Sequence, residues 1–161
     1  MSEDLKTVES AYSAIGSNAS GDKLSQSDYH SEMNSAREEL LKLVRDAVSA
    51  AEDRKGADIV VLRVSEVSYL ADYFVFITGF SRVQVRAIAQ GIQENVEKEL
   101  HRLPRRTEGE AEGSWVVLDY GDAMLHILMP REREFYNLEA FWGHAERIEL
   151  TASNPVGKRE T

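Results

Sequence analysis

The segment GSWVVLDYGDAMLHILM, which covers residues 113–129, decides how this chain folds. It holds two apolar runs, WVVL and AMLHILM, separated by the polar link DYGD at residues 119–122. This pattern predicts a β-hairpin, because a glycine that tolerates a positive φ lets two right-twisted strands reverse direction within a few residues. We therefore expect two strands joined by a tight turn.

The same segment concentrates side chains that bind or react. They are an indole, a phenol, an imidazole and two carboxylates, from Trp115, Tyr120, His126, Asp119 and Asp122. Converging carboxylates could hold a divalent cation for phosphoryl transfer, with Asp72 as the one further candidate ligand. Tight turns also select aspartate and glycine, since aspartate bonds neighbouring backbone amides. We favour the turn interpretation and predict no catalytic residue, no metal and no cofactor.

The flanking sequence predicts an α/β fold in which a mixed β-sheet is layered with helices, in the order α-β-β-α-(β)-β-β-α. Capping-box patterns at Ser35 and Ser81 open two amphipathic helices, the first closing near Gly56 and the second reaching Leu100. The remaining expected elements are strands at 58–64 and 73–78, an optional edge strand within 104–113, and one or two short helices within 131–142 that pack on the sheet.

The chain divides into three parts by composition. Residues 1–34 form an acidic, serine-rich extension whose apolar residues are too sparse to bury a face, so we expect it to be disordered or partly helical. Residues 35–150 form the folded domain, and residues 151–161 form a loose tail.

Most aromatic side chains of the last third of the domain are expected in its core. They are Trp115, Tyr120, Phe135, Tyr136, Phe141 and Trp142. Trp115 stands at the start of a strand beside a glycine, and we expect it to be partly exposed. His126 alternates with apolar neighbours and is expected to be half-buried. Exposed tryptophan and tyrosine often anchor protein interfaces.

The overall charge restricts the kind of partner. The 161-residue chain carries a formal net charge of −9, and it has no cysteine. A broad surface for nucleic acid is not expected, because such binding depends on lysine and arginine displacing counterions. An acidic protein meets a basic partner more readily. We find no apolar run that spans a membrane and no signal peptide, and we expect a cytoplasmic protein.

Four blocks of the sequence resemble the ribosomal silencing factor family, also called Iojap or RsfS. They are DYFVFITG at 72–79, SRVQVRAIA at 81–89, WVVLDYGDAMLHI at 115–127 and FYNLEAFW at 135–142. The resemblance covers about residues 35–148. The chain departs from the family pattern at Phe80, at Phe141 and in its N-terminal extension.

The resemblance implies a nucleotidyltransferase-like core without catalysis, and a function in translation. Family members bind the large ribosomal subunit through its basic protein fourteen, prevent the small subunit from joining, and repress translation under nutrient limitation or in stationary phase. On this basis we expect Trp115 and Tyr120 to be apolar anchors and Asp119 and Asp122 to be charge partners, with His126 in the same partner-binding set.

Two other interpretations stay open on the sequence alone. One is a divergent Mg²⁺-dependent nucleotidyltransferase-like enzyme that uses Asp72, Asp119 and Asp122. The other is a scaffold whose exposed aromatics serve self-association, so that the free protein is a homodimer.

Overall fold

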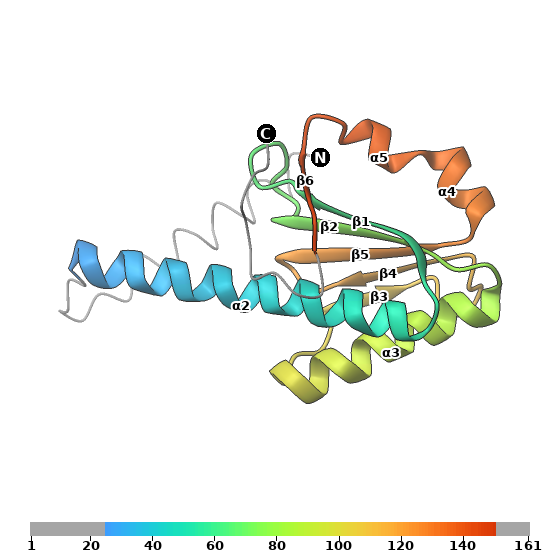
Figure 1. Cartoon of the computed structure of the whole chain (residues 1–161), viewed down its shortest axis with the longest axis horizontal. Helices are drawn as coiled ribbons and strands as arrows, with labels where there is room; N and C mark the ends of the chain where they lie inside the picture. The colour runs from blue at the N-terminus through green and yellow to red at the C-terminus, as the bar shows by residue number, and fades with distance from the viewer. Residues whose placement is uncertain (1–24, 151–161) are drawn as a thin grey trace. The chain divides into compact units, whose positions relative to one another are not determined.

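The computed structural model describes residues 25–150, and Figure 1 shows how their helices and strands are arranged. The predicted tail at 151–161 and most of the predicted extension lie outside the described residues. Within residues 25–150, no helix combines the length and the apolar character needed to cross a membrane.

A mixed sheet of six strands forms the centre of the domain, in the order β3-β4-β5-β2-β1-β6. β2 pairs with β5 in parallel, and the other neighbouring strands pair antiparallel. The strands are β1 (Ala57–Arg63), β2 (Tyr73–Thr78), β3 (Arg106–Glu108), β4 (Trp115–Asp119), β5 (Ala123–Leu128) and β6 (Glu146–Ile148). The predicted α/β fold with a mixed sheet and layered helices is confirmed, including the optional edge strand, here β3.

The predicted hairpin is the pair β4–β5, in which Trp115 faces Leu128 and Val117 faces His126. The backbone N–H of Tyr120 donates to the carbonyl of Ala123 at 2.9 Å and closes the turn. Gly121 adopts a φ of +89°, the left-handed region that the sequence pattern requires of it. The hairpin lies inside the sheet, because β3 flanks β4 and β2 flanks β5.

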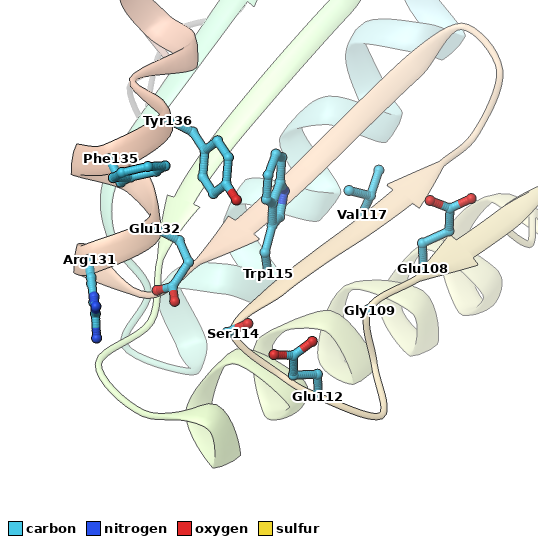
Figure 2. Close-up of a pocket in the computed structure, with 10 residues that line it drawn as sticks. All are labelled: Glu108, Gly109, Glu112, Ser114, Trp115, Val117, Arg131, Glu132, Phe135 and Tyr136. Carbon is cyan, nitrogen blue, oxygen red and sulfur yellow. The ribbon is translucent and has the colours of Figure 1, made fainter.

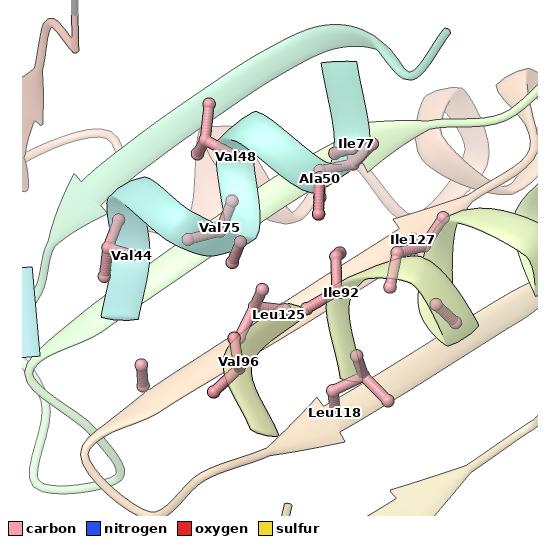
Figure 3. Packing of buried hydrophobic residues seen from close by; sticks show 14 of the residues in the cluster. Val44, Val48, Ala50, Val75, Ile77, Ile92, Val96, Leu118, Leu125 and Ile127 are labelled. Atoms are coloured by element: carbon pink, nitrogen blue, oxygen red, sulfur yellow. The ribbon is translucent and has the colours of Figure 1, made fainter. Parts of the chain in front are cut away.

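Two long helices, α2 (Gln26–Asp53) and α3 (Arg82–Leu100), supply the apolar side chains that cover one face of the sheet. Figure 3 shows Val44 and Val48 of α2 and Ile92 of α3 over the strands. The larger core cluster lies here, and the strand side chains in it come from alternate positions of β1, β2, β4 and β5, as a half-buried pleat requires. The members that Figure 3 labels on the strands are Val75, Ile77, Leu118, Leu125 and Ile127.

The start of α2 differs from the prediction. The sequence placed it at Ser35, but the helix begins at Gln26 and Ser35 lies within it. Ser25 provides the cap: its hydroxyl accepts from the N–H of Asp28 at 3.2 Å, and the Asp28 carboxylate accepts from the N–H of Ser25 at 3.2 Å. The prediction followed the apolar stripe, whose buried residues begin only at Leu40, whereas this helix starts with a capped, largely polar segment that is exposed to solvent.

The start of α3 agrees with the prediction. The hydroxyl of Ser81 accepts from the N–H of Gln84 at 3.0 Å, and the Gln84 side chain accepts from the N–H of Phe80 at 2.8 Å. The helix ends at His101, which takes the left-handed conformation.

Two short helices, α4 (Pro130–Tyr136) and α5 (Leu138–Phe141), lie on the other side of the sheet (Figure 1). A smaller core cluster forms there, in which Leu138 and Trp142 pack against buried residues that include Phe74. Short helices packed on the sheet were predicted, but the expected burial of Phe135 and Phe141 is wrong: 79% and 76% of their surfaces are exposed. β6 was not predicted, because three residues show no usable alternation.

Candidate functional site

An open pocket of about 590 Å³ lies between α4 and the β3–β4 side of the sheet (Figure 2). Its lining comes from three parts of the sequence: β3 with the link that follows it, the start of β4, and α4. The residues are Glu108, Gly109, Glu112, Ser114, Trp115, Val117, Arg131, Glu132, Phe135 and Tyr136. The pocket thus joins aromatic walls with three carboxylates and one guanidinium.

The aromatic wall is a chain of three rings. The ring centroids of Trp115 and Tyr136 are 4.9 Å apart, and those of Tyr136 and Phe135 are 5.0 Å apart with the planes nearly perpendicular. Trp115 is half-buried, as expected, whereas Tyr136 and Phe135 are exposed. Exposed aromatic rings that lie next to one another on a folded domain are typical of an interaction site.

His126 lies beneath Trp115 and fixes its indole. The indole Nε1–H donates to Nδ1 of His126 at 3.2 Å, and the imidazole stacks on Phe76 with ring centroids 5.2 Å apart. Burial lowers the pKa of His126 to about 4, so the ring is neutral at pH 7 and Nδ1 is free to accept. With 9% of its surface exposed, His126 has little to offer a partner directly, and the expectation that it contacts one is corrected to a positioning role.

Tyr120 is not a surface anchor. Only 2% of its surface is exposed, and it belongs to the core cluster under α2 and α3. Burial raises the pKa of its phenol to about 12, and its hydroxyl has no hydrogen-bond partner among the described residues. The expectation that Tyr120 contacts a partner is therefore wrong, because the turn directs its ring towards the helices and away from solvent.

The two turn carboxylates have structural partners. Asp119 accepts from the backbone N–H of Gly121 at 2.7 Å. Asp122 accepts from both terminal nitrogens of Arg102, at 3.0 and 3.2 Å, and Arg102 also donates to the carbonyl of Tyr120 at 2.8 Å. Within residues 25–150, no group of three or more histidine, aspartate or glutamate residues is placed to hold a metal ion. Asp72 lies next to Asp122, since its backbone N–H donates to the carbonyl of Asp122 at 2.8 Å, but this is a backbone contact. The hydrogen bonds of Asp119 and Asp122 agree with the turn interpretation.

Arg86 of α3 holds the link between β3 and β4, which forms one wall of the pocket. Its guanidinium donates to the carbonyls of Glu110 and Ala111, both at 2.8 Å, and to the carbonyl of Glu112 at 3.2 Å. The segment also folds back on itself, since the N–H of Gly113 donates to the carbonyl of Gly109 at 2.9 Å and both glycines have positive φ. Glu112 is thereby carried on a fixed segment.

Sequence reasoning missed Glu108, Glu112 and Glu132 as members of one site. They come from three elements, and no local spacing links them. The available signal was the aromatic pair Phe135-Tyr136, which was noted but expected in the core.

Comparisons with known proteins point to one family. A family model described as "Ribosomal silencing factor during starvation" matches residues 37–161. The chain is 36% identical over 115 residues to the ribosomal silencing factor RsfS of Halalkalibacterium halodurans, covering 71% of this chain and 95% of that protein. It is 37% identical over 113 residues to the chloroplastic protein Iojap of Zea mays, covering 70% of this chain and 48% of the longer plant protein. A crystal structure of a Chromobacterium violaceum protein, 32% identical, superimposes with a TM-score of 0.62 and covers 73% of this chain and 92% of that one.

Proposed function

The chain belongs to the ribosomal silencing factor family, and from this membership we propose that it binds the large ribosomal subunit through basic ribosomal protein fourteen and blocks the small subunit from joining. The family comprises non-enzymatic factors that silence ribosomes and regulate translation. The proposed outcome is repression of translation under nutrient limitation or in stationary phase. The relatives from bacteria favour action in the cytoplasm, although the plant relatives are chloroplastic.

The docking face that we propose is the open part of the sheet beside α4. The observation that carries this proposal is the aromatic cluster of Trp115, Phe135 and Tyr136 at the mouth of an acidic pocket. Large rings supply much of the affinity of protein interfaces, and surrounding charges select the partner. Asp119 follows Trp115 and Val117 at alternate positions of β4, so it lies on the same face and remains a proposed charge partner. The Asp122 carboxylate is already paired with Arg102 and contributes less.

The charge of the domain fits a basic protein partner better than ribosomal RNA. Residues 35–150 contain 15 lysine and arginine residues against 21 aspartate and glutamate residues, a net charge of −6. Such a surface is repelled by phosphates and attracted by a basic protein. This supports docking through a ribosomal protein rather than through the RNA.

Sedimentation of the purified protein with separated subunits tests the proposal. We expect co-migration with the large subunit and not with the small one. Phe135→Ala removes a largely exposed ring and should leave the fold intact while weakening binding by about tenfold or more, as expected for an anchor residue. Tyr69→Ala is the matched control, because Tyr69 is an aromatic residue with 99% of its surface exposed that does not line the pocket.

Two results would contradict the proposal at different levels. Failure to co-migrate with the large subunit would refute the function. Normal co-migration with equal affinity of Phe135→Ala, Trp115→Ala and the native protein would refute the docking face.

A further inference from the structure

We propose that the pocket between α4 and β3–β4 is a receptor for one arginine side chain of the partner protein. This inference rests on the proposed function for the identity of the partner, and on the pocket itself for the chemistry.

The cavity is open to solvent and large enough to admit a side chain. A volume of about 590 Å³ lies in the range of pockets that enclose small ligands. Its walls are firm on both sides. Arg86 holds the segment that carries Glu112, and Arg133 of α4 donates to Thr78 of β2 and to Glu139 of α5, both at 2.7 Å.

The charge of the lining calls for a cation. Three carboxylates line the cavity from separate parts of the chain: Glu108 from β3, Glu112 from the link after it and Glu132 from α4 (Figure 2). Arg131 is the one basic residue in the lining, and it forms no ion pair within residues 25–150. Glu108 pairs at 3.7 Å with Arg106, which is not part of the lining, whereas Glu112 and Glu132 form no ion pair within residues 25–150. The lining therefore keeps an acidic surplus that comes mainly from Glu112 and Glu132.

Glu132 has an unmet bonding requirement. Its Oε2 is buried and has no hydrogen-bond partner among the described residues. A buried carboxylate oxygen without a donor is costly, and the cost is recovered when a donor arrives with the ligand. Because Glu132 lines the cavity, an entering cationic donor can supply that bond after a small rotation of the carboxylate.

The aromatic wall selects guanidinium over ammonium. Trp115 and Tyr136 contribute neighbouring rings to the lining. A planar guanidinium stacks on such rings and donates two parallel hydrogen bonds to a carboxylate, whereas a lysine ammonium acts as a strongly hydrated point charge. The pocket offers both the ring and the carboxylate, which is the combination that arginine uses.

The first experiment measures the binding of a small probe to the pocket of the full-length protein, without the ribosome. The probe is N-acetyl-arginine amide, and the readout is the indole N–H resonance of Trp115 in the ¹⁵N-labelled protein. The chain has two tryptophans, so Trp142→Phe assigns the two signals. We expect a saturable shift with the arginine probe, a several-fold weaker response to the lysine analogue, and no response to the neutral citrulline analogue.

Two charge-removing variants on α4 distinguish binding in the pocket from a general effect of the protein's negative charge. Glu132→Gln should weaken the binding of both the arginine probe and the large subunit by about tenfold, because it removes the negative charge that the guanidinium would meet in the pocket. Glu134→Gln removes the same charge from an exposed position of the same helix that does not line the pocket, and should leave both affinities unchanged.

The outcomes distinguish this inference from the proposed function. The arginine pocket is refuted, and the proposed function stands, if the protein binds large subunits but Glu132→Gln binds them with the affinity of the native protein. The same conclusion follows if the citrulline analogue shifts the Trp115 resonance as much as the arginine probe does. If the arginine probe binds as described but the protein ignores large subunits, the proposed function is refuted and the pocket's preference stands.

Discussion

Trp115 and His126 form a pair whose hydrogen bond exists in only one protonation state of the imidazole. Nδ1 accepts from the indole only while it carries no proton, and the ring is enclosed by Phe74, Phe76 and Trp115. The orientation of a proposed anchor thus depends on a buried neutral histidine.

This pair makes stability depend on pH. The pKa of His126 is about 4 in the folded protein, against an ordinary value of 6.5 when unfolded. Between these values the unfolded chain binds a proton that the folded chain does not, so the free energy of unfolding falls as the pH falls from 6.5 to about 4, by roughly 3 kcal/mol in all. Urea unfolding at a series of pH values measures this loss. His126→Gln, which keeps an acceptor but does not titrate here, should lack this part of the pH dependence, and identical curves for both proteins would contradict the assignment.

Tyr120 gives a second test of a buried polar group. Its hydroxyl is buried without a partner within residues 25–150, so Tyr120→Phe removes an unmet bonding requirement and keeps the packing. We expect the free energy of unfolding to stay unchanged or to rise by about 1 kcal/mol, with unaltered binding to the large subunit. Chemical denaturation of both proteins checks this. A loss above about 1 kcal/mol would show that the hydroxyl has a role that the fold does not reveal.

Some single-residue roles could be predicted from the sequence and others could not. The turn role of Asp119 was predictable, because an aspartate two residues before a glycine bonds its amide locally. The burial of Tyr120 was not, since strand alternation says nothing of where a turn side chain points. Glu132 needed the whole fold to bring it to Glu108 and Glu112.

Among the helices and strands, the sequence predicted those with strong local signals. The Ser81 cap, the β4–β5 hairpin, and the strands β1 and β2 follow from patterns within a few residues. The polar first turns of α2 and the three-residue β6 carry weak signals, and so their bounds were missed. The pairing of β2 with β5 joins residues that are 50 positions apart, and no local sequence pattern predicts it.

The segment 109–113 shows how one helix supports the proposed site from a distance. Arg86→Gln removes most of the bonds to three consecutive carbonyls, so amide exchange in this segment should rise by about tenfold and binding to the large subunit should weaken. Hydrogen exchange followed by mass spectrometry measures the first effect and sedimentation the second. Arg82→Gln, an exposed arginine of the same helix, is the control. Unchanged exchange in Arg86→Gln would show that the segment is held by its own turn.

For the molecule as a whole, the acidity of the domain predicts the kinetics of association. Attraction between unlike charges accelerates encounter and is screened by salt. We expect the association rate with the large subunit to fall by roughly tenfold from low to high ionic strength, while the dissociation rate changes much less. Surface-based kinetic measurement at several salt concentrations checks this. An association rate that is independent of salt would contradict electrostatic steering.

The oligomeric state of the free protein stays a prediction. The exposed rings that we propose as the docking face could also pair with a second copy. Sizing chromatography over a dilution series tests for a dimer, and Phe135→Ala should shift any dimer towards the monomer.

The parallel pairing of β2 with β5 has a consequence for how the chain folds during its own synthesis. Tyr73 pairs with Ala123, which is translated 50 residues later. The apolar edge of β2 therefore stays unpaired until β5 has been synthesised. Contacts between such distant residues slow folding, and an unpaired strand edge invites aggregation. A chain released before residue 123 therefore lacks the strand that completes its sheet. We expect such fragments to require chaperones or to be degraded, and only the nearly complete polypeptide to acquire a stable native state.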